Sequence, residues 1–220
     1  MRRTTLLATG LTLTLALAAG CDREADPLLC GDVGPGDLVI TEIRGGPAIT
    51  DADGQWIELH NASGAAVELH GLSITIDSIG GSTHRRLLIR RPLSVEPGGY
   101  AVVGKFADAG LPAHVDVGWG TEPNIPRDGA ITLACAEEID RITFTTLTDP
   151  TQGIDTQPLD PPMPGRGTYA LGTMPPTAAA NDDPGQWCAD STETPGPCSG
   201  DDCLEYYKGS PGEPNRGCTP

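Results

Sequence analysis

The clearest strand in the sequence is the run Trp56-Ile57-Glu58-Leu59-His60-Asn61, in which apolar and polar side chains alternate. Successive side chains of an extended chain point to opposite faces, so Ile57 and Leu59 share one face while Glu58 lies on the other. We expect Ile57 and Leu59 to face the core, and Asn61 to cap a turn where the strand ends. The run therefore predicts a strand whose apolar face packs on a second layer.

Similar runs of apolar and β-branched residues occur on both sides of this strand, separated by Gly, Asp and Pro. The expected strands are 38–43, 55–60, 67–76, 84–89, 100–103, 115–117, 130–134 and 139–144. Gly71 inside the third run indicates a bulge or a close backbone approach. No useful stretch has a 3.6-residue apolar period, so we expect almost no helix after residue 20. Many short strands separated by turn residues are typical of an all-β sandwich.

The charge balance excludes one class of partner. The 220 residues include 14 Lys and Arg but 30 Asp and Glu, which gives a net charge of -16. Proteins that bind nucleic acid gain affinity by neutralising phosphates with Lys and Arg, so we expect no nucleic-acid partner. Aromatic residues make up only 4% of the chain, so the core must rest on Val, Ile, Leu and Ala. The composition also excludes a coiled coil, a collagen and a polytopic membrane protein.

Residues 1–20 have the organisation of a secretory signal. Two Arg follow Met1, and 6–19 is an uncharged, mostly apolar stretch that is too short to span a membrane. It ends in Leu17-Ala18-Ala19-Gly20-Cys21, which resembles the bacterial lipobox, whose Cys is lipidated. We therefore expect a protein anchored through Cys21 in the cell envelope, periplasmic or surface-exposed, on the outer membrane. Ordinary secretion with cleavage nearby, twin-arginine export and the choice of membrane leaflet stay open.

The rest of the chain divides into three parts. Residues 21–36 hold Gly and Pro with little apolar pattern, and predict a tether between the lipid and the domain. The strand-like runs place a β-sandwich at 37–147. Residues 148–220 are rich in Pro and Gly and have few apolar runs. They predict an irregular, disulfide-held extension in which Trp187 is a buried anchor.

Six cysteines remain if Cys21 carries the lipid, and an even number in an exported chain implies disulfides. These candidates are Cys30, Cys135, Cys188, Cys198, Cys203 and Cys218. The spacing does not choose among the pairings, but four of the six follow residue 187, so we expect the extension to be linked to itself. The chain has no C-x-x-C pair and no His beside the late cysteines, so we expect neither structural zinc nor another cofactor.

Several motifs follow one another in a recognisable order. A Glu-bearing strand at Ile40-Thr41-Glu42-Ile43 precedes the Trp-Ile-Glu-Leu-x-Asn run. A Val-x-Leu-x-Gly-Leu run at 67–72 and a Glu-Pro-Gly-Gly-Tyr turn at 96–100 come after it. In this order the motifs resemble the lamin tail domain family over about residues 37–147, which implies an immunoglobulin-like β-sandwich. The segments 180–183, 186–188 and 209–215 are similar to extensions that follow bacterial lamin-tail domains.

The resemblance implies a non-catalytic interaction module, as found on nuclear intermediate filaments and beside hydrolase or nuclease domains of exported bacterial proteins. The chain contains no G-x-S-x-G, H-E-x-x-H, P-loop or G-x-G-x-x-G motif. We expect a lipid-anchored scaffolding or interaction protein rather than an enzyme, with an envelope protein or polysaccharide as partner. The alternatives are a metal-dependent hydrolase, an accessory subunit of a secreted hydrolase or nuclease, and a purely structural envelope protein.

One repeated pattern is a weak metal-site candidate. Glu58-Leu59-His60 recurs as Glu68-Leu69-His70. If 61–66 formed a hairpin loop, Glu58 would lie opposite His70 and His60 opposite Glu68, with all four side chains on one face. Such a group could bind a metal or respond to pH. The simpler interpretation is a pair of cross-strand polar contacts.

A second weak metal candidate is the turn Asp51-Ala52-Asp53-Gly54, which resembles the opening of a calcium loop. An EF-hand loop needs a Glu at its twelfth position, and that position is Ala62 here. The sequence therefore predicts an acidic turn at Asp51 and Asp53, and leaves weak calcium binding open.

The one basic run of this acidic chain is His84-Arg85-Arg86-Leu87-Leu88-Ile89-Arg90-Arg91. One interpretation is contact with an anionic polymer or an acidic partner. The other is an edge strand whose charges prevent pairing with a second edge. Alternation leaves charged and apolar side chains on both faces, which fits an edge. The candidate interaction patch is Arg85, Arg86, Arg90 and Arg91.

Overall fold

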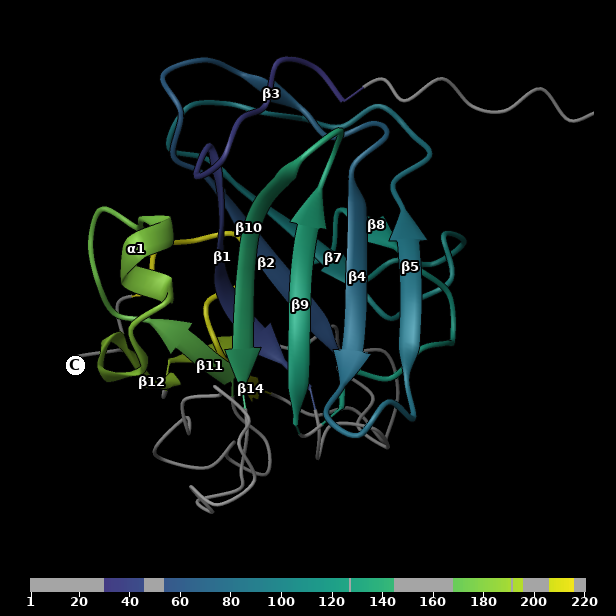
Figure 1. Cartoon of the computed structure of the whole chain (residues 1–220). Helices are drawn as coiled ribbons and strands as arrows, with labels where there is room; N and C mark the ends of the chain where they lie inside the picture. Colours follow the sequence, from purple (N-terminus) through teal and green to yellow (C-terminus); the bar gives the residue numbers. More distant parts are fainter. Residues whose placement is uncertain are drawn as a thin grey trace, which may run out of the picture.

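Two mainly antiparallel sheets form the frame of the computed structural model, which describes residues 30–45, 54–126, 128–144, 168–190, 192–195 and 206–215 (Figure 1). The larger sheet has the strand order β12 (Trp187–Asp190), β11 (Thr168–Leu171), β1 (Leu38–Arg44), β2 (Trp56–Asn61), β7 (Tyr100–Gly104) and β8 (Val117–Gly118). The smaller sheet has the order β10 (Glu138–Phe144), β9 (Gly129–Ala134), β4 (Ser73–Ser78) and β5 (His84–Leu88). The two layers make an all-β sandwich, as the alternating runs predict.

Short elements complete the described part of the chain. β3 (Val67–Glu68) pairs with β6 (Ser94–Val95), and β13 (Glu193–Pro195) pairs with β14 (Tyr206–Lys208). The helical elements α1 (Ala178–Asn181) and η3 (Pro184–Gln186) together span seven residues of the described ranges. This small share of helix agrees with the absence of a 3.6-residue period in the sequence.

The core lies between the two sheets and is built from aliphatic side chains. Ile57 and Leu59 of β2 are fully buried there, as the alternation predicts. Ile74 of β4 and Ile131 of β9 come from the opposite sheet into the same cluster. Burying one such side chain contributes about 1.5–3 kcal/mol. Aliphatic packing therefore holds the layers together in a chain with few aromatic residues.

The long run at 67–76 is divided by a turn rather than forming one strand. Gly71 has a φ of 93°, and the amide of Leu72 donates to the carbonyl of Leu69. A side chain at Gly71 would be strained at this φ, so glycine is required for the turn. The run consequently supplies β3 to a small ribbon and β4 to the four-stranded sheet.

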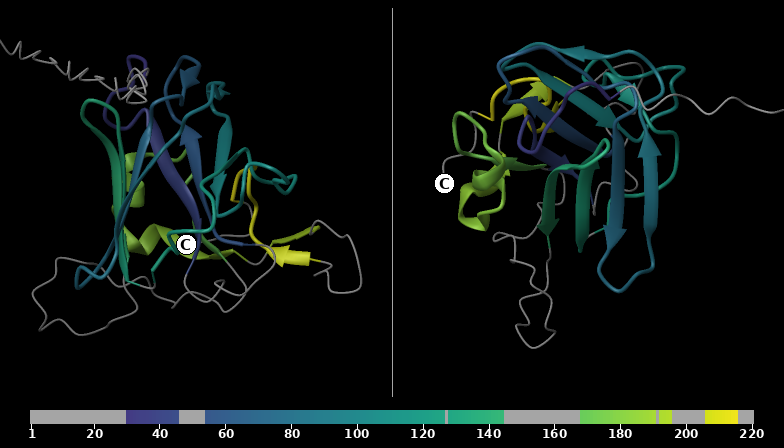
Figure 2. Two further views of the ribbon diagram at one scale, coloured as in Figure 1. Left: turned by 90° about the vertical axis from the view of Figure 1, so that its right-hand side faces the viewer. Right: turned by 45° about the horizontal axis from the view of Figure 1, so that its top comes forward.

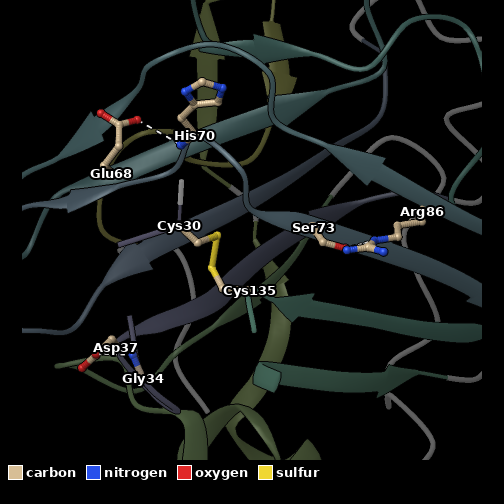
Figure 3. Close-up of a disulfide and its surroundings, with 8 residues drawn as sticks. All are labelled: Cys30, Gly34, Asp37, Glu68, His70, Ser73, Arg86 and Cys135. Atoms are coloured by element: carbon tan, nitrogen blue, oxygen red, sulfur yellow. Dashed lines mark hydrogen bonds between the residues drawn. A yellow bond between two sulfur atoms is a disulfide. The ribbon is translucent and has the colours of Figure 1, made fainter. Parts of the chain in front are cut away.

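A disulfide between Cys30 and Cys135 ties the segment before β1 to the end of β9 (Figure 3). The same segment is held by hydrogen bonds, since the Gly34 amide donates to the Asp37 carboxylate and the Gly36 amide donates to the Ile139 carbonyl. Cys188 is also disulfide-bonded. The end of the expected tether is thus attached to the sandwich.

The region after residue 147 contributes to the larger sheet. β11 pairs with β1 and β12 pairs with β11, so two strands from the extension continue the sheet next to β1. Trp187 is 5% exposed, and its indole N–H donates to the Asn181 carbonyl at 2.8 Å. The expected buried anchor is confirmed. The expectation of an irregular extension is wrong for 168–190, because the pairing of β11 with β1 and of β12 with β11 orders segments too short to show a strand pattern.

Asn61 caps the turn at the end of β2, as the sequence predicts. Its side-chain amide donates to the carbonyls of Ala65 and Val95, each at 2.8 Å, and its carbonyl oxygen accepts from the amide of Ser63. We expect Asn61→Ala to lower the free energy of unfolding by about 2 kcal/mol, because a buried carbonyl loses its donor. Urea unfolding checks this. Ser82→Ala in the exposed turn after β4 is the control, and an equal effect of both changes would contradict the prediction.

Several expectations fall on residues outside the described ranges: the signal 1–20, lipidation of Cys21, the acidic turn at Asp51 and Asp53, and Cys198, Cys203 and Cys218. Within the described ranges, no helix has the length and apolar character needed to cross a membrane.

Candidate functional site

A groove of about 580 Å³ opens between the edges of the two sheets. β5 is the last strand of the four-stranded sheet and β8 is the last strand of the six-stranded sheet, and both lie on the same side of the sandwich (Figure 1). Leu87, Val117 and Trp119 supply apolar lining, while Arg86 and other residues of the basic run supply charge. The volume lies in the range of about 300–1,000 Å³ that is typical of ligand-binding clefts.

The basic run is distributed around this groove. Arg86, Arg90 and Arg91 line it, whereas Arg85 is exposed on β5 and donates to the carbonyl of His84. Arg86 is oriented by a 2.7 Å hydrogen bond from its Nε to the hydroxyl of Ser73 on β4 (Figure 3). Asp108 is the one acidic residue in the lining. Three of the four predicted patch residues therefore give the groove a positive charge.

β5 is an edge strand, as one interpretation of the basic run requires. It pairs with β4, and no strand within the described ranges pairs with its other side. The amide of Ile89 donates to Leu72, and the carbonyl of Thr83 accepts from Ser78. Antiparallel pairs bond through alternate residues, so the backbone groups of residues 84, 86 and 88 point away from β4. These groups face the open side of the sheet.

A second candidate site is a buried group of carboxyl side chains on the larger sheet. A bulge between Ile40 and Glu42 places Glu42 directly opposite Glu58 of β2. Asp190 at the end of β12 joins them, and all three residues are at most 1% exposed. Two ionised carboxylates in such neighbouring positions would repel each other strongly.

The 209–215 segment covers these carboxyl groups. The Ser210 amide donates to Glu42, and the Ser210 hydroxyl lies 2.7 Å from the Asp190 carboxylate. The Gly212 amide donates to Glu58 at 2.7 Å. Figure 2 shows this yellow segment on the side of the β1–β2 layer that faces away from the four-stranded sheet. The segment therefore seals the outer face of the larger sheet.

Asn215 fixes the end of the same segment. Its side-chain amide donates to the carbonyls of Thr41 and Leu171, at 2.9 and 3.2 Å. Gly209 begins the segment with a φ of 139°, and a Cβ there would collide with Glu42 and Thr168. Glycine is required at this position for both reasons. The 209–215 motif is visible in the sequence, but its contacts with Glu42 and Glu58 are not, because the partners lie 168 and 154 positions apart.

Burial controls the protonation of the acidic group. Desolvation raises the pKa of Glu42 to about 8, with the charge of Asp190 adding to the effect. Desolvation and the nearby Glu42 also raise the pKa of Glu58 well above its usual range. Hydrogen bonds from Thr41 and Gly212 oppose this rise. The carboxyl groups of Glu42 and Glu58 are thus held under the 209–215 segment largely in their neutral form at moderately acid pH.

Neither the weak four-residue metal-site candidate nor the simpler pair of cross-strand contacts forms. β2 lies between β1 and β7, and β3 pairs with β6, so the hairpin pairing of Glu58 with His70 is absent. His60 lies instead opposite Tyr100, with ring centroids 4.7 Å apart. The Glu68 carboxylate accepts from the amide of His70 (Figure 3). The described residues contain no group of three His, Cys, Asp or Glu side chains arranged to hold a metal ion.

No protein-family model matches the chain, and no curated protein matches it significantly. The functional interpretation therefore depends on the two sites described above. The cluster of Glu42, Glu58 and Asp190 is buried within the fold, whereas the basic groove is open.

Proposed function

We propose that the protein is a non-catalytic interaction module of the cell envelope, anchored by lipid on Cys21, and that its binding surface is the groove between β5 and β8. The single observation that supports this function is the open groove lined by Arg86, Arg90 and Arg91. The whole chain has a net charge of -16, so a cluster of positive charge is unlike the rest of the molecule. An acidic protein that gathers arginines around one cleft is suited to an anionic partner.

The resemblance to lamin tail domains supports the same function. It implies an immunoglobulin-like sandwich used as an accessory or interaction module, and the all-β sandwich is compatible with that family. The carboxyl groups of Glu42 and Glu58 do not offer an alternative active site, because both are fully buried under the 209–215 segment. Access of a substrate to them would require that segment to leave.

Crosslinking on intact cells tests this function. The lipidated protein carries a C-terminal tag, and crosslinked partners are identified by mass spectrometry. We expect one dominant envelope partner, which is lost with Arg86→Glu and with Arg91→Glu because the groove then repels an anionic surface. Cys21→Ala is expected to lose the partner as well, since the protein is no longer anchored.

Arg141→Glu is the matched control. Arg141 is exposed on β10, at the opposite edge of the same four-stranded sheet. This variant makes the same change of charge away from the groove, so we expect it to keep the partner. A scatter of abundant envelope proteins that is the same for all variants would contradict the proposed function.

A further inference from the structure

We propose that the groove binds an extended, acidic polypeptide segment, which pairs with the outer side of β5 and becomes a fifth strand of the four-stranded sheet. The inference rests on the proposed function and narrows it to one chemical class of partner. Three observations support it: the unpaired backbone edge of β5, the apolar floor of the groove, and the charge of its rim.

The backbone edge is available for pairing, apart from the His84 carbonyl, which accepts a hydrogen bond from the Arg85 side chain. Residues 84, 86 and 88 direct their amides and carbonyls away from β4, as the bonds of Thr83 and Ile89 to β4 require. β5 has five residues and rises by about 3.3 Å per residue, so it offers a ladder for about five residues of a partner strand. Strand addition of this kind supplies affinity through main-chain hydrogen bonds, and pockets beside the edge supply specificity.

The groove provides such a pocket directly beside the edge. Leu87 is half-buried and faces Ile74 across the sheet, and Val117 lines the opposite wall. Trp119 is held by a 3.1 Å hydrogen bond from its indole N–H to the Pro123 carbonyl, which fixes the ring in the lining. Alternate side chains of a docked strand would point into this apolar floor, and the others would remain outside.

The rim selects the charge of the occupant. Arg86, Arg90 and Arg91 line the groove against a single acid, Asp108. A second β5 edge would bring arginines opposite arginines, so the run that attracts an acidic strand also rejects a copy of itself. An anionic polysaccharide satisfies the charge but has no peptide groups to pair with the edge. An acidic polypeptide satisfies both.

The test measures peptide binding to the full lipidated chain in detergent. The probe is a capped peptide of about eight residues in which Glu and Val alternate, long enough to cover β5. We expect it to bind, and to bind at least about tenfold more weakly to the Arg86→Glu variant than to the native protein or to Arg141→Glu. The Lys-for-Glu version of the peptide should not bind.

Two changes separate strand pairing from simple charge attraction. Methylation of alternate backbone amides removes donors on one edge of the peptide, and we expect binding to fall by at least about tenfold. Leu88→Pro removes an outward amide of β5 without removing a bond to β4, because edge strands tolerate Pro there. Leu88 also lines the groove, so Leu88→Ala is the reference that removes this side chain and keeps the amide. We expect Leu88→Pro to weaken binding clearly more than Leu88→Ala. Thermal unfolding of both variants verifies that the sandwich is intact.

The possible failures are distinguishable. Equal binding of the methylated and the unmethylated peptide would overturn strand addition. So would binding of alginate, an anionic polysaccharide, in place of the peptide, and in that case the interaction function would stand. If instead no cellular partner depends on Arg86, the proposed function itself fails. Light scattering measures whether the native chain associates with itself. Association through β5 would mean that the edge binds a second copy of the chain, and would overturn the proposal of an acidic partner strand.

Discussion

Raising the pH from about 5 to about 8 is expected to destabilise the protein, because the buried carboxyl groups must lose their protons. The pKa of Glu42 is about 8 in the folded chain against an ordinary value of 4.5. Below pH 4.5 both the folded and the unfolded chains hold this proton, so the contribution of the neutral Glu42 to the free energy of unfolding is fully present. As the pH rises toward 8, only the unfolded chain releases the proton, and this contribution is lost.

The expected magnitude is large. Each pH unit in this window changes the free energy of unfolding by about 1.4 kcal/mol for one group, so Glu42 alone accounts for at most about 5 kcal/mol. Glu58 acts in the same direction. Burial also raises the pKa of Asp140 from 3.8 to about 6, which extends the loss of stability to lower pH. The free energy of unfolding of a typical domain is about 5–15 kcal/mol, so the ionisation of these groups can remove a large part of it.

The measurement is urea unfolding at several pH values for the native chain and for Glu42→Gln. Gln cannot ionise, so we expect the stability of the variant to fall less steeply with pH. Glu96→Gln removes an acid that is exposed and controls for the general repulsion in a chain of net charge -16. Identical slopes for Glu42→Gln and Glu96→Gln would show that Glu42 does not titrate in this window.

Removing the Cys30–Cys135 disulfide is expected to lower the free energy of unfolding by about 3–5 kcal/mol. The bridge joins residues separated by 105 positions. Closing so long a loop restricts the unfolded chain strongly, and the restriction favours the folded state. The double change Cys30→Ser and Cys135→Ser leaves no free thiol from this pair and keeps Cys188 in its own disulfide.

Urea unfolding under non-reducing conditions measures this effect. The Cys30→Ala and Cys135→Ala double variant is the control for polarity, because both cysteines pack against the core. We expect the two double variants to agree within about 1 kcal/mol, since the lost chain restriction is common to them. A total effect below about 1 kcal/mol in both would contradict the prediction, and would mean that the contacts of Gly34 and Gly36 suffice to hold the segment before β1.

Local patterns predicted the sandwich because its central strands carry their burial in their own sequence. Ile57 and Leu59 alternate with polar residues and face the core. Asn61 caps a turn through bonds within a few residues, together with one to Val95. These features depend on neighbours in the chain or on one buried face, which a periodic pattern reports directly.

The missed features depend on contacts between distant parts of the chain. β11 has only four residues, and its pairing with β1 is not visible in its composition. The repeated Glu-Leu-His pattern favours a hairpin with Glu58 opposite His70, but β2 has β1 and β7 as neighbours instead. The hydrogen-bond donors that compensate for the burial of the Glu58 carboxyl group include the amide of Gly212, 154 positions away. No local rule predicts that an acidic side chain will be covered by so remote a segment.

The order in which the chain is made gives the 209–215 segment a further consequence. β1 contains the first strand residues of the sandwich, yet Thr41 receives its hydrogen bond from Asn215, 174 positions later. Contacts between residues so far apart in the chain form late in folding. The entropy cost of closing the loop comes before the free energy that the contacts contribute. Because synthesis starts at the N-terminus, the outer face of the larger sheet cannot be completed until residue 215 has been synthesised. Until then the strands that carry Glu42 and Glu58 lack the amide donors of Ser210 and Gly212.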